Sequence, residues 1–362
     1  MEKCFVMNVT GSNYLNNAIL SPISIDISLS ILLIGSSGLT FKQLLTGLKY
    51  PTNYSINLIQ SNSFLLIKSM KKAGGIEYAT KIYVNEKFSL QNVYKSAIQK
   101  YFHSGIETMN FSDRQKSANT INDFISTSTN GMIENMLKES DINLDSSFIL
   151  INCIYFKGIW VNQFNKNKTT EDDFMVNETY SIKIPFMKTK AKFKFGFINE
   201  LNGSSVIELP YANSNLTLTI VLPSKDIDLN NLIQLSKNYD WKNLSNRLRN
   251  QTLSVEIPKF NATINQFLNR PLIKMGMDSL FDSSTAQLNH IVHNNGTPIR
   301  VTLDYLYHQA VINIDEEGTT AAATTAASSR SMPITFLATK PFLYLLRTSS
   351  TIYFIGHFTG KN

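Results

Sequence analysis

The spacing of apolar residues in the first part of the chain is mostly helical. Residues 56–73 and 91–102 repeat apolar side chains with the period of one face of an α-helix. Residues 18–34 begin like a strand, but Pro22 then stands where a helix starts, and Ser21 is a suitable N-cap. We therefore expect helices over 22–34, 56–73, 91–102 and 119–137, and a strand over 76–84.

From residue 148 onward the apolar pattern becomes typical of strands. Segments rich in Ile, Val, Phe and Thr predict strands at 148–155, 182–187, 193–197, 205–209, 216–222 and 252–257. A helical pattern over 230–248 interrupts them, and the end of the chain predicts a hairpin that turns at 348–350. Because helices come mainly early and strands mainly late, we predict an α+β fold with large antiparallel sheets.

One segment interrupts this pattern. Residues 316–333 are rich in small side chains and contain no large apolar residue before Met332, yet they lie between two expected strands. A loop of this length inside a compact domain is uncommon, and it is usually functional or disordered. A plain surface linker is the alternative interpretation.

Composition excludes several broad classes of protein. The chain has 362 residues, of which 43% are hydrophobic and 17% charged, so it can bury a core and is not a disordered chain. Its length alone suggests two or three domains. No run of about 18 apolar residues is present, so we expect no membrane-spanning helix.

The net charge of +7 comes from 34 basic and 27 acidic residues. Nucleic-acid-binding proteins usually collect such an excess on one face. Here the basic residues are scattered, and the densest group alternates with apolar residues as it would along a strand edge. That group comprises Lys183, Lys188, Lys190, Lys192 and Lys194. We interpret the charge as a contribution to solubility and expect no nucleic-acid partner, with a polyanion-binding patch as the alternative.

Two cysteines, Cys4 and Cys153, are too few for a disulfide framework. Cys153 lies in an apolar run and is interpreted as a small buried hydrophobic residue. Polar residues between Asn8 and Asn13 leave no room for the apolar core of a signal peptide. We therefore expect a leaderless protein that stays in the cytoplasm or leaves the cell by an unconventional route.

Motifs of several enzyme classes are absent from the sequence. It contains no Gly-x-x-x-x-Gly-Lys phosphate loop, no Rossmann glycine triplet and no Gly-x-Ser-x-Gly elbow. The five histidines do not follow the spacing of zinc ligands, so no metal site is expected. The sequence therefore gives no positive indication of an enzyme.

Residues 310–325 (AVINIDEEGTTAAATT) resemble the hinge of the serpins, the serine protease inhibitor superfamily. Other serpin-like motifs follow in the family's order over almost the whole chain. They are 17–25 (NAILSPISI), 150–160 (LINCIYFKGIW), 206–223, 255–260, 275–281 and 340–344 (KPFLY). The absence of a leader and of disulfides resembles the intracellular, ovalbumin-like branch of that family.

The resemblance implies a single serpin domain over residues 1–362, with about nine helices and three β-sheets. It implies an exposed reactive-centre loop at about 316–336. In the family a protease attacks this loop as a substrate and forms an acyl-enzyme, and the cleaved loop then inserts into the main sheet. We therefore expect a monomeric suicide inhibitor, not an enzyme, whose partner is a serine protease in a covalent complex.

The composition of the hinge favours an active inhibitor. Its residues are Glu317, Gly318, Thr319, Thr320, Ala321, Ala322 and Ala323. Small side chains enter a packed sheet with little steric resistance, and after Glu317 the hinge has no charge to bury. Gly318 supplies the backbone freedom that a hinge needs. A non-inhibitory serpin with a binding or chaperone role is the alternative.

The attacked bond can be placed in two ways. Counting back from Pro341 by the family's spacing selects Arg330–Ser331, which suits a trypsin-like protease because such enzymes hold Arg in a carboxylate-bearing pocket. Counting forward from Thr319 selects Met332 instead, and that choice implies elastase-like or chymotrypsin-like targets. We favour Arg330–Ser331, because Pro333 follows Met332 and proteases rarely accept Pro there.

Other positions match family roles one by one. Ser21, Ser24, Asn152 and His308 match the hydrogen-bonded shutter under the opening sheet, and Trp160 matches the aromatic residue where the hinge enters. Lys68, Lys71 and Lys72 can lie on a helix where some serpins bind heparin, although three lysines more often form a solvated face. No cofactor is expected to be required, and a heparin-like polyanion remains an option.

Overall fold

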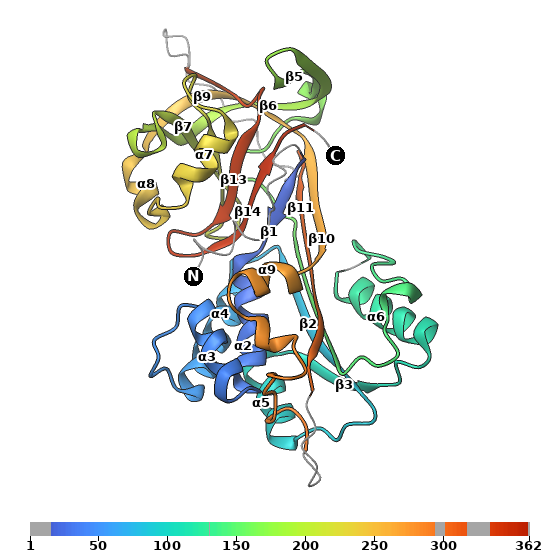
Figure 1. The fold of residues 1–362 in the computed structure, drawn as a ribbon. Coiled ribbons are helices and arrows are strands. Elements are labelled where there is room, and N and C mark those ends of the chain that lie inside the picture. Colours follow the sequence, from blue (N-terminus) through green and yellow to red (C-terminus); the bar gives the residue numbers. More distant parts are fainter. Residues whose placement is uncertain (1–15, 130, 294–300, 317–333, 361–362) are drawn as a thin grey trace.

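The computed structural model describes residues 16–129, 131–293, 301–316 and 334–360. Its strands form two hydrogen-bonded sheets (Figure 1). The smaller sheet has the order β10 (Phe260–Phe267), β11 (Leu303–Ile314), β4 (Phe148–Phe156), β2 (Ile76–Asn85) and β3 (Gly105–Met109). The larger sheet runs β1 (Ala18–Leu20), β14 (Ile352–Phe358), β13 (Phe342–Arg347), β8 (Thr217–Leu222), β7 (Ser204–Pro210), β6 (Tyr180–Ile198), β9 (Arg249–Pro258) and β12 (Ile334–Leu337), with β5 (Thr170–Asn177) paired to β6.

Eight α-helices occur in the described ranges. They are α2 (Pro22–Ile34), α3 (Gly38–Gly47), α4 (Ile56–Ala73), α5 (Asn92–Phe102), α6 (Arg114–Ser128), α7 (Leu229–Ser236), α8 (Leu244–Arg247) and α9 (Asn269–Lys274). This arrangement confirms the α+β class. None of these helices is long and apolar enough to cross a membrane.

We expected three sheets, but the strands form two hydrogen-bonded sheets. The reason is that β6, a continuous strand of 19 residues, belongs to two regions of the larger sheet. Its first part pairs with β5 and β9, and its last residues pair with β7. The sequence pattern predicts two separate strands in this region, at 182–187 and 193–197, because the lysines between 188 and 192 interrupt the apolar residues. A single strand therefore joins regions that we expected to be distinct sheets.

The centre of the smaller sheet is a parallel pair of strands, β4 and β11. The two are hydrogen-bonded directly, from Leu303 opposite Phe148 to Ile312 opposite Phe156. Helix α6 covers one face of this sheet, and α2 lies on the other side (Figure 1). Every residue of β4 is buried, so both faces of the central pair are packed.

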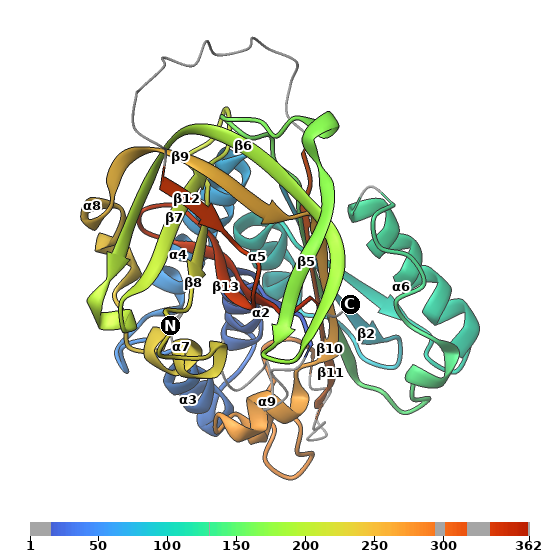
Figure 2. The same ribbon diagram turned by 90° about the horizontal axis from the view of Figure 1, so that it is seen from above.

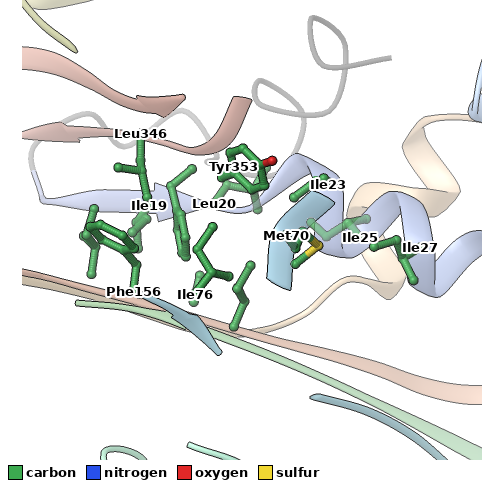
Figure 3. Packing of buried hydrophobic residues seen from close by; sticks show 14 of the residues in the cluster. Ile19, Leu20, Ile23, Ile25, Ile27, Met70, Ile76, Phe156, Leu346 and Tyr353 are labelled. Carbon is green, nitrogen blue, oxygen red and sulfur yellow. The ribbon is translucent and has the colours of Figure 1, made fainter. Parts of the chain in front are cut away.

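Helix α2 lies in the middle of the molecule. All of its residues except Asp26 are buried, because the helix is apolar around its whole circumference apart from small serines. Figure 3 shows Ile19 and Leu20, which directly precede the helix, between two layers, with Leu346 and Tyr353 on one side and Ile76 and Phe156 on the other. As expected, Ser21 caps this helix, and its Oγ accepts a hydrogen bond from the Ser24 backbone N–H at 3.4 Å.

Two predicted helices have different bounds in the structure. The helix expected over 119–137 is α6, which starts at Arg114, because Asp113 caps it by accepting from the Lys116 N–H at 3.1 Å. The helix expected over 230–248 is divided into α7 and α8 by a 3₁₀ turn at Trp241–Asn243. Helix α4 has the predicted bounds, since Ser55 caps its start and Gly74 ends it with φ of 77°.

Candidate functional site

A buried polar network connects the two central strands of the smaller sheet. Asn152 of β4 and His308 of β11 stand directly opposite each other, and the His308 Nδ1 lies 2.7 Å from the Asn152 Oδ1. Because that oxygen can only accept, Nδ1 carries the proton. The other ring nitrogen, Nε2, accepts from the Ser21 backbone N–H at 3.5 Å. Both ring nitrogens of His308 are therefore engaged.

Asn152 connects this pair to two further elements. Its Oδ1 accepts from the Ser24 Oγ at 2.9 Å, and its Nδ2 donates to the Thr80 Oγ1 of β2 at 3.0 Å. We call Ser21, Ser24, Thr80, Asn152 and His308 the shutter network, and all five are buried. The structure thus brings together four residues that the sequence comparison selected, and it adds Thr80, which sequence reasoning missed.

Burial determines the protonation state of the shutter network. Removal from water lowers the pKa of His308 to about 3. His308 is therefore neutral near pH 7, which matches its one donated and one accepted hydrogen bond. A neutral histidine with no access to solvent is a structural hydrogen-bonding group and not an exposed general base.

A second cluster lies where β11 ends. The Trp160 Nε1–H donates to the backbone carbonyl of Asp315 at 2.7 Å, and the indole stacks on Tyr211 with ring centroids 4.2 Å apart. The Lys157 Nζ lies 3.8 Å from the Asp315 carboxylate. The aromatic residue expected at the entry point is thus in contact with the first residue after β11.

Glu316 is the last described residue before the segment 317–333, and it is fixed by two partners. Its Oε2 accepts from the Lys259 Nζ at 2.8 Å, and its Oε1 accepts from the Thr169 Oγ1 at 2.7 Å. Burial alone raises the pKa of Glu316, but these two hydrogen bonds outweigh burial and leave the pKa below its usual value. A charged carboxylate therefore anchors this end of the segment.

The remaining predicted site residues divide into two groups. Residues 317–323 of the hinge, Arg330, Ser331 and Met332 lie outside the described residues. Lys68, Lys71 and Lys72 are exposed on α4, and their spacing places them on neighbouring positions of one face. The expected loop end at about 336 overlaps β12, which begins at Ile334.

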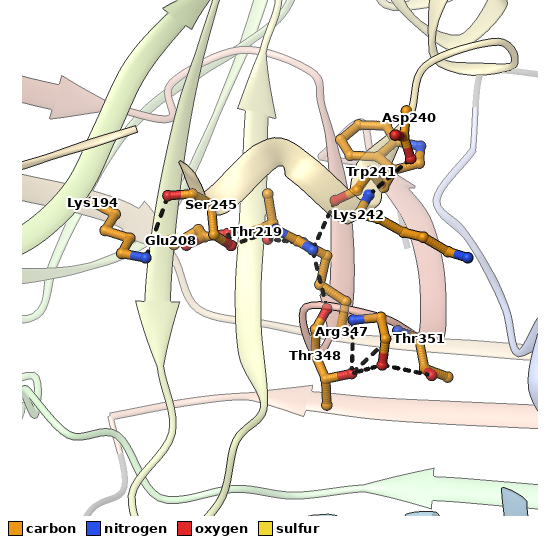
Figure 4. Close-up of polar contacts among 11 residues, drawn as sticks. Lys194, Glu208, Thr219, Asp240, Trp241, Lys242, Ser245, Arg347, Thr348 and Thr351 are labelled. Atoms are coloured by element: carbon orange, nitrogen blue, oxygen red, sulfur yellow. Dashed lines mark hydrogen bonds and ion pairs between the residues drawn. The ribbon is translucent and has the colours of Figure 1, made fainter. Parts of the chain in front are cut away.

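A buried ion pair, not foreseen from the sequence, lies in the larger sheet (Figure 4). The Arg347 Nη2 lies 2.6 Å from the Glu208 Oε1, with 2% and 7% of the two side chains exposed. Arg347 also donates to the Thr219 hydroxyl and to the carbonyl oxygens of Trp241 and Thr348, at 3.0 to 3.1 Å. Only the register of β7, β8 and β13 brings these residues together.

Comparison with known proteins agrees with this architecture. The family model described as Serpin (serine protease inhibitor) matches residues 6–360. Serine protease inhibitor 42Dd of Drosophila melanogaster is 30% identical over 94% of this chain and 90% of its own length. Serpin B4 of Homo sapiens is 28% identical over 95% of this chain and 94% of its own length.

Solved structures show the same fold. Native protease nexin-1 with heparin matches with a TM-score of 0.87 at 24% identity, covering 99% of this chain and 96% of that one. Cleaved Serpin 42Da matches with a TM-score of 0.88 at 24% identity, covering 100% and 96%.

Proposed function

Because the chain belongs to the serpin family, we propose that it inhibits trypsin-like serine proteases as a suicide substrate attacked at Arg330–Ser331. The observation that carries this proposal is the direct parallel pairing of β4 and β11. A segment that reverses direction after β11 is antiparallel to β11 and, since the pair is parallel, also to β4. The segment 317–333 follows β11 after only Asp315 and Glu316, so it can enter between these two strands.

Insertion of this segment would be energetically favourable. One ladder between β4 and β11 is broken, and two ladders with the new strand form, so the net gain is one ladder. About ten hydrogen bonds at roughly 1 kcal/mol each amount to about 10 kcal/mol. The threonines and alanines of 319–323 suit this position, because both faces of the central pair are packed.

We propose that the shutter network and the Trp160 contact control this opening. Separation of β4 from β11 must break the bond between His308 and Asn152, while Ser24 and Thr80 hold Asn152 in place. Entry of the hinge must begin beside Trp160 and the anchored Glu316. These contacts would keep the sheet closed until the loop has been cut.

We further propose that residues 1–362 act as one monomeric domain and as an inhibitor, not as an enzyme. Nothing in this mechanism requires a cofactor. The protease supplies the nucleophile, and the chain supplies the substrate bond and the receiving sheet. A heparin-like polyanion at Lys68, Lys71 and Lys72 would be an addition to this mechanism.

Incubation with trypsin, followed by boiling in detergent, tests the proposal. We expect a covalent band with the mass of trypsin plus the chain up to Arg330, and mass spectrometry should find the released peptide beginning at Ser331. Arg330→Ala should abolish this band, and the matched Met332→Ala variant should retain it. If trypsin cuts the loop and leaves at full activity, the inhibitory function is wrong and a non-inhibitory binding or chaperone role is favoured. Covalent complexes with elastase or chymotrypsin alone would favour the Met332 site.

A further inference from the structure

The outward face of β6 carries a row of lysines that the proposed mechanism does not use. Lys188, Lys190 and Lys192 are two residues apart, so they project from the same side of the strand, about 7 Å from one to the next. Lys190 and Lys192 are exposed, whereas Phe193, on the opposite side, is buried in the core. We call these three residues the lysine row.

The charge of the lysine row is only partly neutralised. Lys188 contacts Glu256 at 3.2 Å and Asp172 at 3.9 Å. In the pairing with β9, Lys190 and Lys192 instead stand opposite Ser254 and Thr252, which carry no charge. Within the part of the chain that the structure describes, neither lysine has an ion-pair partner. Among the described residues, Lys190 and Lys192 are therefore two exposed ammonium groups without a carboxylate partner.

The lysine row lies close to the end of the segment 317–333. Figure 2 shows β6, β9 and β12 side by side, and the register places Ala191, Leu253 and Ile334 on one line across them. Two strand spacings amount to about 10 Å. Ile334 is only four residues after Arg330, and four residues span at most about 14 Å. The lysine row therefore lies within roughly 25 Å of the proposed reactive bond.

A protease bound at Arg330 would be large enough to reach this face. A domain of about 230 residues has a radius of gyration of roughly 17 Å and therefore a diameter of about 45 Å. If the bound protease is tilted toward β12, the protease surface beside its active-site cleft reaches the lysine row. Opposite charges at the edge of a protein–protein interface mainly increase the rate of association, and this increase is smaller at high salt.

We propose that Lys188, Lys190 and Lys192 form a docking surface for an acidic face of the attacking protease. The chain then selects anionic trypsin-like enzymes over cationic ones of the same cleavage specificity. This proposal rests on the proposed attack at Arg330, but not on the later covalent trapping. A sulfated polysaccharide is the other polyanion that free lysines can bind, and it is distinguished below.

Anionic and cationic trypsin provide the test, because both cleave after Arg and Lys. The rate at which intact chain disappears is measured by gel electrophoresis at about 50 mM and about 300 mM salt. We expect anionic trypsin to react about tenfold faster at low salt, with the difference shrinking at high salt. K190E/K192E should abolish or reverse this preference. K95E/K100E, which places the same charge change on exposed positions of α5, should retain it.

The outcomes separate this inference from the proposed function. If K190E/K192E keeps the wild-type preference for anionic trypsin, the docking surface is wrong. If the double variant loses only an acceleration by added heparin, the lysine row binds sulfated polysaccharide, and the proposal is also overturned. Cut chain without a covalent band contradicts inhibition but leaves the rate comparison valid. If neither trypsin cuts at Arg330, both proposals fail.

Discussion

The Nδ1 atom of His308 lies 2.7 Å from the Oδ1 atom of Asn152, across the parallel pair of β11 and β4. This hydrogen bond spans the line along which the cut loop would enter the sheet in the proposed mechanism. It is buried, and its members belong to two strands that are 156 residues apart in the chain. This bond stabilises the closed sheet, and the proposed insertion must break it.

Asn152→Ala should loosen the closed sheet. The substitution removes one hydrogen-bond partner each from Ser24, Thr80 and His308. It leaves the buried Nδ1–H of His308 without its acceptor, and such an unsatisfied group costs about 1–3 kcal/mol. We expect the free energy of unfolding of the intact chain to fall by at least about 2 kcal/mol, measured in urea. The matched control is Asn261→Ala, which removes an exposed Asn from a neighbouring strand. Equal stability of the two variants would contradict the role of Asn152.

Acid should destabilise the protein through His308. Its pKa is about 3 in the folded chain and near 6.5 when unfolded, so the unfolded state binds more protons between these values. The contribution of neutral His308 to the free energy of unfolding is complete above pH 6.5 and is lost as the pH falls toward 3. Between pH 7 and pH 5, the wild type should lose about 2 kcal/mol more stability than His308→Gln. Parallel stability curves for the two proteins would show that His308 is not the titrating group.

Trp160→Phe should weaken the contact at the end of β11 while keeping an aromatic ring against Tyr211. The change removes the donor to the Asp315 carbonyl, which is worth about 1 kcal/mol, together with part of the ring that stacks on Tyr211. If this contact holds the hinge back, the intact variant should lose inhibitory activity faster than the wild type during incubation at raised temperature. Phe164→Leu, which alters the neighbouring packing but no hydrogen bond, is the control. Identical decay of Trp160→Phe and wild type would remove Trp160 from this role.

The buried ion pair of Arg347 and Glu208 should be important for stability. Arg347→Met leaves the carboxylate of Glu208 buried without its charge partner, which costs about 3–5 kcal/mol. Arg247→Met provides the comparison, because the pair of Arg247 with Glu200 is exposed and its loss should have little measurable effect. Urea unfolding of both variants checks this difference. Similar urea midpoints for the two variants would mean that the buried ion pair contributes little to stability.

Local patterns predicted much of the fold. The bounds of α4 and the cap at Ser21 follow from apolar spacing and capping residues, which act over a few positions. The apolar pattern did not predict α3, because Gly38 begins this helix with φ of 52°, a conformation that glycine tolerates and that no apolar period reveals. Strands β3 and β5 were missed because they are short or mostly exposed, and exposed strands lack a strong apolar pattern.

The candidate site depended more on tertiary register. Ser21, Ser24, Asn152 and His308 were selected by resemblance to the family, and the structure brings them into contact. Thr80 and Lys259 carry no local signal, because Thr and Lys are usually surface residues. Only the pairing of β2 with β4, and the position of Lys259 beside Glu316, reveals their contacts.

The central claim is that the segment after β11 becomes a strand between β4 and β11 once it is cut. The most direct measurement is the thermal unfolding midpoint of the chain before and after cleavage at Arg330. A gain of about 10 kcal/mol should raise the midpoint by about 10–15 °C, and Ala321→Arg should suppress the rise because a charge would have to enter the packed sheet. If the cleaved wild-type chain unfolds at or below the midpoint of the intact chain, the insertion mechanism is contradicted.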